Sequence, residues 1–329
     1  MEKFNPTISV VLVVRNGEKF IREAVSSILE QTYENFEFLI IDDGSADHTK
    51  EIVRKYRDNR IQLFDNPGPS GRPGGLNFAF ETAKGQYIAL MDADDISLPT
   101  RFEKQLRFLE QNPEIGIVGA QAIKINEVGE VIGYQGKNKM NHQGCRKLLL
   151  TGNSCFINPS VLIRKASIPK GINYKKDYPY AEDYDFFCQS FFHTKFANLG
   201  ERLIKYRIHE EQISSRHLNK QKKLANIIFS DFLSMFILNE STDKVSSQKN
   251  ISILKKISEG GGIYLHDVIH IYSSLNINVS LLERAGLINS YIRKNLNNLS
   301  LNKSIHIKDF LYFLMFLYWK NRKRGKKFK

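Results

Sequence analysis

The feature that most constrains the fold is a series of short apolar segments that alternate with segments of helical periodicity. The first, Ile8–Val14, reads Ile-Ser-Val-Val-Leu-Val-Val, a composition typical of a strand buried on both faces. Further strand segments follow at Phe36–Ile41, Ile61–Phe64 and Tyr87–Met91. Strands separated by helices at short intervals form right-handed βαβ units, so we expect an α/β fold with a mostly parallel central sheet.

The intervening segments place apolar residues at helical spacing. We expect helices over Phe20–Gln31, Asp47–Tyr56, Leu76–Ala83, Pro99–Asn112 and Glu182–His193, shorter strands at Ile115–Ala120, Ser160–Arg164 and Leu203–Arg207, and a Gly/Pro-rich loop over Asn66–Gly75. From Asn219 onward helical patterns dominate, and Glu259–Gly262 has the composition of a linker. We therefore divide the chain into an α/β domain, residues 1–217, and a mainly helical C-terminal region, residues 218–329.

Carboxylates follow two of the predicted strands. Asp92, Asp94 and Asp95 come directly after the strand at Tyr87–Met91, and Asp42 and Asp43 come directly after the strand at Phe36–Ile41. The carboxyl ends of parallel strands share one edge of the sheet, where ligands bind in open α/β folds. Clustered carboxylates there suit a hard divalent cation that also holds a substrate phosphate, although a solvated acidic turn would show the same pattern.

Other segments carry weaker signals. Gly68–Gly75 offers glycines and Arg72 for binding phosphate, but matches neither the dinucleotide-binding nor the Walker pattern, and a plain surface loop is the alternative. Glu182 and Asp183 supply a candidate general base, or acidic residues that only complement a helix dipole. His209 is a candidate nitrogen ligand for a metal such as Mn²⁺, or an ordinary surface histidine.

The net charge of +13 favours a polyanionic partner, either nucleic acid, anionic lipid or a phosphorylated substrate. Much of it follows the aromatic segment Phe310–Trp319, so we expect Phe310–Lys329 to lie on an anionic membrane surface, the alternative being a core helix with a solvated tail. No window reaches the length of a membrane span. The 3 cysteines and the absence of an apolar leader favour a cytoplasmic protein.

Taken together, these segments resemble the family 2 glycosyltransferases of the GT-A fold. The resemblance rests on Ile8–Asn16, Ile40–Ser45 (Ile-Ile-Asp-Asp-Gly-Ser), Ala83–Arg101, Asn158–Ser160, Glu182–Asp183 and Tyr206–His209, and covers about residues 7–217. The order and spacing of these motifs make the match more specific than any one of them.

The resemblance implies a nucleotide-sugar donor, commonly a UDP-sugar, and metal-dependent transfer with inversion. On matching positions, Val13, Arg15, Asn16 and Asp43, with Asp42 beside it, would hold the nucleoside, and Asp92 would face the ribose. Asp94, with Asp95, would hold Mn²⁺ or Mg²⁺, and His209 would join the metal or the diphosphate. Asp183 would be the general base, with Glu182 as a contact to the acceptor or a substitute base.

Two departures refine this expectation. The first strand of the family usually ends in Pro-x-Tyr-Asn, whereas Arg15 takes the place of the aromatic residue here, which leaves the nucleobase open. The Gln-x-x-Arg-Trp motif of processive synthases is missing, so we expect one sugar per visit, added to a glycan or lipid-linked acceptor in surface-glycan synthesis. There are two rival interpretations. One is a basic nucleic-acid- or lipid-binding protein with a GT-A-like shell, and the other is a nucleotidyltransferase. We expect no nucleic-acid partner, because the basic residues gather in a run beside apolar aromatics, whereas a nucleic-acid-binding face would interleave basic and aromatic residues.

Overall fold

The structure is a computed structural model that describes residues 5–67, 71–136, 139–150, 152–212 and 216–240. The predicted linker at 259–262 and the predicted membrane-surface segment at 310–329 lie outside these residues. The chain divides into two compact units, and the first consists of Met1–Leu149 with Asn153–Ile228. The boundary falls inside helix α8 (Leu218–Glu240), whereas we placed the domain boundary at the start of that helix.

Four parallel strands form the first half of the sheet. They are β1 (Ile8–Val14), β2 (Phe36–Asp42), β3 (Ile61–Asp65) and β4 (Tyr87–Met91), in the spatial order β3-β2-β1-β4. Every residue of β1, β2 and β4 is buried, as their continuous apolar composition predicts. This half of the sheet confirms the predicted βαβ arrangement.

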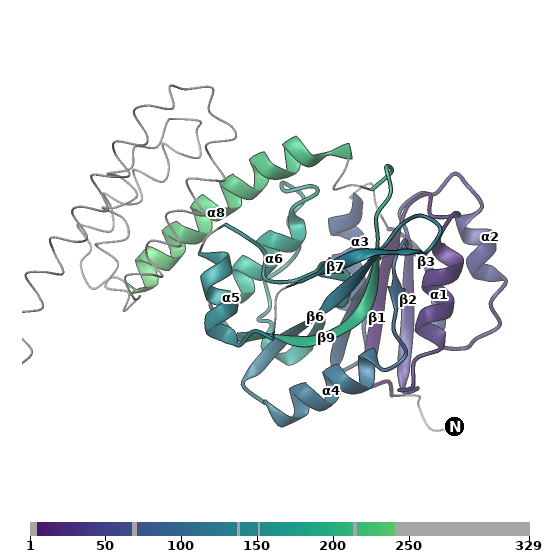
Figure 1. The fold of residues 1–329 in the computed structure, drawn as a ribbon, viewed down its shortest axis with the longest axis horizontal. Coiled ribbons are helices and arrows are strands. Elements are labelled where there is room, and N and C mark those ends of the chain that lie inside the picture. Colours follow the sequence, from purple (N-terminus) through teal and green to yellow (C-terminus); the bar gives the residue numbers. More distant parts are fainter. Residues whose placement is uncertain (1–4, 68–70, 137–138, 151, 213–215, 241–329) are drawn as a thin grey trace, which may run out of the picture. The chain divides into compact units, whose positions relative to one another are not determined.

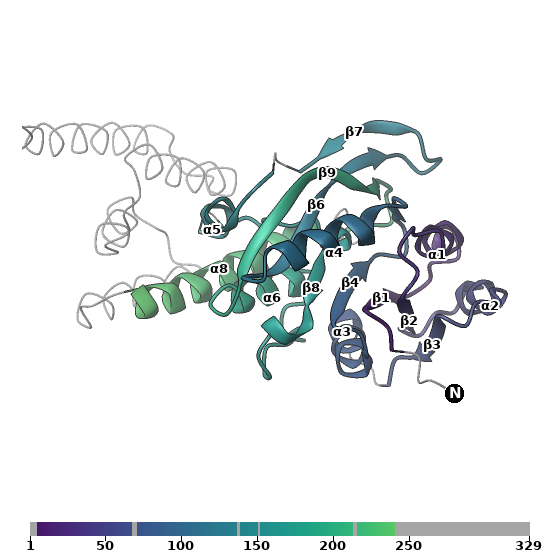
Figure 2. The ribbon, with the colours of Figure 1, turned by 90° about the horizontal axis from the view of Figure 1, so that it is seen from below.

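The connecting helices cover both faces of this half (Figures 1 and 2). Helices α1 (Ile21–Leu29) and α2 (Thr49–Arg54) lie on one face, and α3 (Gly71–Thr82) lies on the other. A Cβ on Gly75 would approach Val13 Cγ1 to 2.8 Å, so α3 can lie against β1 only because residue 75 is a glycine. The predicted loop over Asn66–Gly75 is therefore wrong in its second half, where α3 has already begun.

The second half of the sheet is mixed. Its strands are β5 (Ile96–Ser97), β6 (Ile115–Ile125), β7 (Val131–Gln135), β8 (Leu162–Arg164) and β9 (Lys195–Arg207). Strand β8 runs antiparallel between β4 and β6, and β6 pairs in parallel with β9, so the sheet is mostly parallel only in its first half. Strand β9 begins well before the predicted Leu203, and neither β5 nor β7 was predicted.

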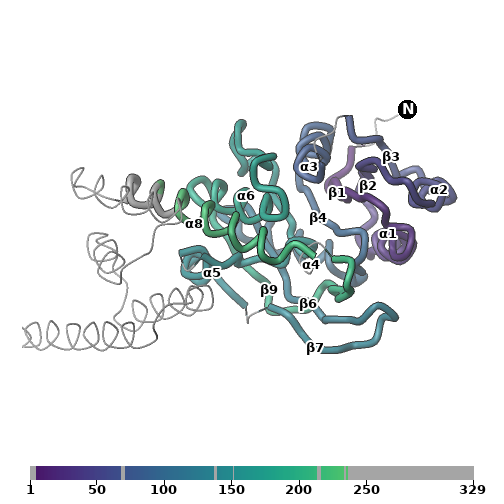
Figure 3. Tube along the Cα trace, turned by 90° about the horizontal axis from the view of Figure 1, so that it is seen from above, coloured from purple at the N-terminus to yellow at the C-terminus, as the bar shows by residue number. Residues whose placement is uncertain are grey.

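The remaining elements surround this half. They are α4 (Arg101–Gln111), α5 (His142–Leu149), α6 (Glu182–Ser190) and two short 3₁₀ turns, η1 (Asn158–Ser160) and η2 (Lys165–Ser167). Figure 3 shows β6, β7 and β9 side by side and away from β1–β3. Among the described helices we find none that is both long and apolar enough to cross a bilayer.

Candidate active site

A cavity of about 380 Å³ lies at the carboxyl ends of β1 and β4. It collects side chains that are distant in the sequence, because the turns after these strands, the start of α6 and the end of β9 meet there. The predicted site residues that line it are Val13, Arg15, Asn16, Arg72, Asp92, Asp94, Glu182, Asp183 and His209. Asp42, Asp43 and Asp95 are not among the lining residues.

The loop after β1 is fixed by the loop after β2. The Asn16 N–H donates to Ser45 Oγ at 2.9 Å, and Asn16 Oδ1 accepts from the Ala46 N–H at 2.8 Å. Asn16 has φ of 53°, a left-handed conformation that asparagine tolerates better than most residues. The Asn16 side-chain oxygen Oδ1 is thus already engaged, which leaves Arg15, exposed beside it, as the freer side chain at this wall.

Asp42 and Asp43 stabilise this loop. Asp42 Oδ1 accepts from the N–H groups of Gly44 and Ser45 at 3.2 and 2.9 Å, an Asx-type turn whose carboxylate is buried. Asp43 Oδ1 accepts from Asn66 Nδ2 at 2.6 Å. Both carboxylates therefore have a local structural partner and are not among the residues that line the cavity; their contact with a nucleoside stays a prediction.

The three carboxylates after β4 point to different partners. Asp92 Oδ1 accepts from Arg72 Nη2 at 2.5 Å, and Asp94 Oδ2 lies 2.9 Å from His209 Nε2. Asp95 is buried and accepts from the Arg207 N–H at 2.8 Å, and burial together with the charges of Asp94 and Asp92 raises its pKa. Asp92 and Asp94 face the cavity, whereas Asp95 lies behind it as part of the wall.

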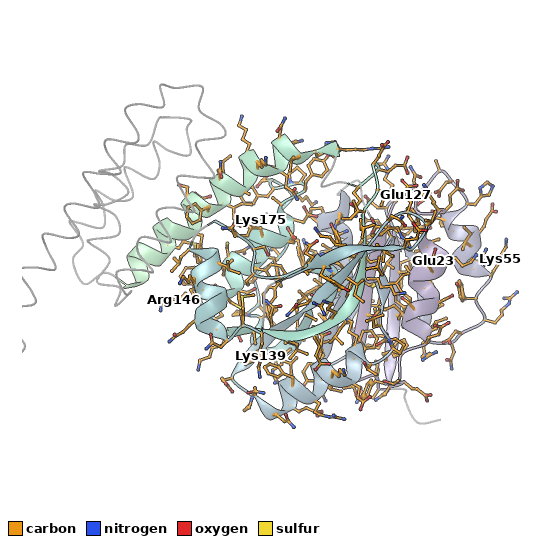
Figure 4. All side chains as sticks on the ribbon, viewed as in Figure 1. Glu23, Lys55, Glu127, Lys139, Arg146 and Lys175 are labelled. Atoms are coloured by element: carbon orange, nitrogen blue, oxygen red, sulfur yellow. The ribbon has the colours of Figure 1, made fainter. Side chains whose placement is uncertain are left out.

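Arg207 connects this acidic turn to its surroundings. Its Nε donates to the Asp94 carbonyl at 2.9 Å, its Nη1 to the Glu127 carbonyl at 2.8 Å, and its Nη2 to Glu23 Oε2 at 2.9 Å. Figure 4 labels Glu23 on α1 and Glu127 on the turn between β6 and β7. The guanidinium thereby fixes the end of β9, two residues before His209.

Arg72 joins the two acidic clusters. Besides Asp92, its Nε lies 3.3 Å from Glu182 Oε1. Burial alone would lower the pKa of Arg72, but the charges of Asp92 and Glu182 outweigh it and hold the pKa above its ordinary value. Arg72 was predicted to lie in a loop, but it lies in the first turn of α3, where it bridges Asp92, directly after β4, and Glu182 of α6. Its contact with a phosphate stays a prediction.

Asp183 stands at the start of α6 with an unusual protonation equilibrium. Burial raises its pKa to about 6, with the neighbouring charge of Glu182 acting in the same direction, while the hydrogen bond from the Tyr184 N–H and the charge of Arg72 act against it. A carboxyl group with a pKa of about 6 is ionised at neutral pH yet basic enough to take a proton. Glu182 is 5% exposed, and its Oε2 has no hydrogen-bond partner among the described residues.

A divalent cation is compatible with this donor set. Among the residues that the structure describes, no group of three or more His, Cys, Asp or Glu side chains is arranged to hold a metal ion. Asp94 Oδ2 and His209 Nε2, 2.9 Å apart on the cavity wall, still supply one oxygen and one nitrogen. Cations of the Mg²⁺ type are commonly held by one or two protein ligands plus substrate phosphates and water, so these two residues fit that mode.

Several lining residues were not predicted as site residues. Asn158 lies in a quoted motif but received no role, and its Oδ1 is buried without a hydrogen-bond partner in the described part of the chain. Tyr180 precedes the Glu182–Asp183 pair and has φ of 76°, which no sequence pattern reveals for an aromatic residue. Gln221 reaches the cavity from α8, outside the predicted catalytic domain.

The mixed α/β sheet flanked by helices, with an acidic cavity at the carboxyl ends of β1 and β4, has the fold of the GT-A glycosyltransferases. Residues 9–171 match the model of glycosyl transferase family 2. The chain is 32% identical over 284 residues to an uncharacterized glycosyltransferase of Haemophilus influenzae, covering 82% of this chain and 87% of that protein. The protein therefore belongs to glycosyl transferase family 2.

Other relatives support this assignment. The O-antigen biosynthesis glycosyltransferase WbnJ of Escherichia coli is 34% identical over 62% of this chain and 80% of its own length. The structure of S. aureus TarS 1-349 in complex with UDP-GlcNAc superposes with a TM-score of 0.59 at 18% identity, over 87% of this chain and 81% of that chain. The mannosyltransferase PcManGT from Pyrobaculum calidifontis, in complex with GDP-Man and Mn²⁺, gives a TM-score of 0.53 at 13% identity, over 88% of this chain and 87% of that one. At these identities the two structures show a shared fold.

Proposed function

We propose that the protein transfers one sugar per visit from a UDP-sugar to a hydroxyl of a glycan or lipid-linked acceptor, with inversion at the anomeric carbon. The observation that carries the proposal is the placement of Asp183, with its pKa of about 6, in the same cavity as the Asp94–His209 pair. The Asp94–His209 pair suits a leaving diphosphate and Asp183 suits a base, and displacement at a sugar carbon requires both.

The chain's own residues account for the proton and for the geometry. The Asp183 carboxylate takes the proton of the acceptor hydroxyl while that oxygen forms a bond to the anomeric carbon. The bond from the anomeric carbon to the diphosphate oxygen breaks on the opposite face, and the diphosphate leaves with the electron pair. Holding donor and acceptor in line supplies much of the remaining rate.

Asp94 and His209 are the proposed holders of a Mn²⁺ or Mg²⁺ ion. Such an ion, when bound, neutralises the charge that develops on the leaving diphosphate. Support comes from their cavity-facing position and from the Mn²⁺ in the PcManGT complex. Asp95 belongs to the wall in this proposal, since its carboxylate is buried against Arg207.

The proposed donor contacts at the ends of β1 and β4 are Val13, Arg15 and Asp92. Arg72 is a proposed contact to the diphosphate, which would replace one of its two carboxylate partners when the donor binds. The complexes of TarS with UDP and UDP-GlcNAc support uridine as the nucleoside. Glu182 is the proposed acceptor contact, because its buried Oε2 could accept from a sugar hydroxyl.

The proposed setting is surface-glycan synthesis at the cytoplasmic face of the cell membrane. Relatives named for O-antigen biosynthesis and for a diphosphoundecaprenol-linked acceptor support a lipid-linked acceptor. The segment Phe310–Lys329 would hold the enzyme on the anionic lipid surface.

The test is a panel of nucleotide-sugars incubated with the protein, with and without Mn²⁺, while free nucleoside diphosphate is measured. We expect metal-dependent release of UDP from one sugar, and its loss in Asp94→Ala with an unchanged melting temperature. Full activity of Asp94→Ala would refute the metal role. Release of pyrophosphate would instead favour a nucleotidyltransferase, and salt-sensitive binding to duplex DNA but not to anionic vesicles would favour the nucleic-acid-binding alternative.

A further inference from the structure

Tyr180 is held in a conformation that a bulky side chain rarely adopts. Its φ of 76° lies in the left-handed region, which costs free energy for an aromatic residue and persists only where the surroundings impose it. The residue lines the cavity and stands directly before Ala181, which precedes the Glu182–Asp183 pair at the start of α6.

Three residues at the start of α8 contact Tyr180: His217 directly before the helix, and Lys220 and Gln221 in its first turn. The ring of His217 stacks on the ring of Tyr180, with centroids 4.2 Å apart and planes 9° from parallel. Gln221 Nε2 donates to the Tyr180 carbonyl oxygen at 2.8 Å, and Lys220 Nζ lies 5.2 Å from the ring centroid. One contact holds the ring and another holds the backbone carbonyl, so both the side chain and the backbone of the residue are restrained.

We infer that the start of α8 positions the catalytic residue: by clamping Tyr180, His217 and Gln221 fix where α6 begins and therefore where the Asp183 carboxylate points. This inference rests on the proposed role of Asp183. It makes Tyr180, His217 and Gln221 positioning residues, and it gives the helix outside the matched family segment a part in the reaction.

The experiment compares Gln221→Ala and His217→Ala with the wild-type protein, using UDP-GlcNAc and the sugar found active in the panel. We expect the turnover number to fall about 10-fold in each variant, because small displacements of a catalytic group are costly. The KM for the donor should stay unchanged, since the proposed donor contacts, Arg72 on α3 included, lie outside α6 and α8. Asn219→Ala, an exposed change on the same helical turn, is the matched control and should leave both constants unchanged.

A role in bulk stability alone would leave the pH dependence of the remaining activity untouched. We expect the acidic limb of kcat/KM to lie at lower pH in Gln221→Ala than in the wild-type protein, because a loosened α6 start admits water to Asp183 and weakens the effect of burial that raises its pKa. Tyr180→Phe keeps the ring stack and the backbone contact, so it should keep most of the wild-type rate. Tyr180→Gly loses the ring stack and should be slower.

Two results are separable. Wild-type turnover and an unmoved acidic limb in both Gln221→Ala and His217→Ala would overturn the positioning role while leaving the proposed function intact. A wild-type protein that turns over no nucleotide-sugar would refute the proposed function. In that case the carboxyl titration of Asp183, followed by NMR in the wild type and in Gln221→Ala, still decides whether α8 controls its environment.

Discussion

Asp183 is ionised at neutral pH in surroundings that oppose its charge. Burial removes water from the carboxylate, and Glu182 adds a like charge beside it, so its pKa rises to about 6. Arg72 offsets part of this, since it lies against Glu182 and Asp92. The residue therefore combines basicity with a cost in stability, as catalytic groups often do.

Asp183→Asn separates these two properties. A carboxyl group whose folded-state pKa is raised binds more protons in the folded than in the unfolded state, so its contribution to stability is lost as pH rises from its ordinary range through about 6. At about pH 8 we expect the variant to gain up to roughly 3 kcal/mol in the free energy of unfolding and to lose roughly 10² or more in turnover. Denaturant titration and steady-state kinetics measure both, with the exposed Asp177→Asn as a neutral control; an active variant would move the base to Glu182 or Asp185.

The same group determines the pH dependence of the reaction. We expect log kcat/KM to be flat above neutral pH and to fall with unit slope below about pH 6, where Asp183 is protonated. The bridging diphosphate of a nucleotide-sugar has no proton to gain in this range, so the limb reports the enzyme. A profile that stays level through pH 5 would contradict the assignment.

At the scale of elements, α3 places Arg72. The helix approaches β1 so closely that Gly75 has Val13 and Ile41 within 3.3 Å of where a Cβ would stand. Arg72 extends from the first turn of this helix to the carboxylates of Asp92 and Glu182. The distance of α3 from the sheet therefore determines whether Arg72 can contact both.

Gly75→Ala tests this arrangement. The added methyl would meet β1 side chains, and we expect a loss of roughly 1–3 kcal/mol in the free energy of unfolding, reduced by the better helix propensity of alanine. The KM for the donor should rise, because α3 and Arg72 shift together. Gly144→Ala on α5, where the nearest atom would be 3.3 Å away on a flexible methionine, is the matched control; equal stability of both variants would refute the close-packing argument.

The sequence predicted the elements whose signals are local. The strands β1 to β4 are continuous apolar runs, and their carboxyl ends gather the acidic residues as expected. The start of α3 was missed because its glycines and prolines indicate a loop, while packing against β1 makes the segment helical. Strand β5 was missed because it is only two residues long and pairs with the distant strand β9. Strand β7 forms a hairpin with the neighbouring β6, but its segment Val-Ile-Gly-Tyr-Gln is largely exposed and lacks the alternation of a half-buried strand.

For the site, the resemblance predicted which residues meet but not how each side chain is used. Asp94, His209 and Asp183 do line one cavity, whereas Asp42 and Asp95 turn to backbone N–H groups. Consecutive aspartates cannot be distinguished from the sequence alone, because the path of the backbone in the turn decides which of their carboxylates faces the cavity. The strained φ of Tyr180 and its clamp by α8 arise from tertiary contacts and leave no local pattern.

For the whole molecule, the basic charge is concentrated at one end of the chain. The residues Lys320, Arg322, Lys323, Arg324, Lys326, Lys327 and Lys329 follow the aromatic segment and lie outside the described structure. Each such residue near an anionic bilayer adds about 1 kcal/mol of attraction.

Deletion of Phe310–Lys329 should therefore release the protein from vesicles that contain anionic lipid, measured by sedimentation at low salt. Turnover of a soluble acceptor should be kept, since the cavity residues lie in the first unit. Neutralising the basic residues to glutamine while keeping the aromatics distinguishes charge from apolar insertion. A truncated protein that still sediments with the vesicles would refute the anchor.

The pairing of the acidic residues with partners inside the protein has a consequence for how the protein behaves without the proposed metal. Asp92 and Glu182 contact Arg72, Asp94 contacts His209, and Asp95 contacts the backbone of Arg207. These ion pairs and hydrogen bonds let the cleft fold without severe repulsion between its acids. A chelator should thus abolish turnover yet leave the melting temperature where it was, and a protein that unravels on chelation would show that the ion, rather than the arginines, holds the cleft together.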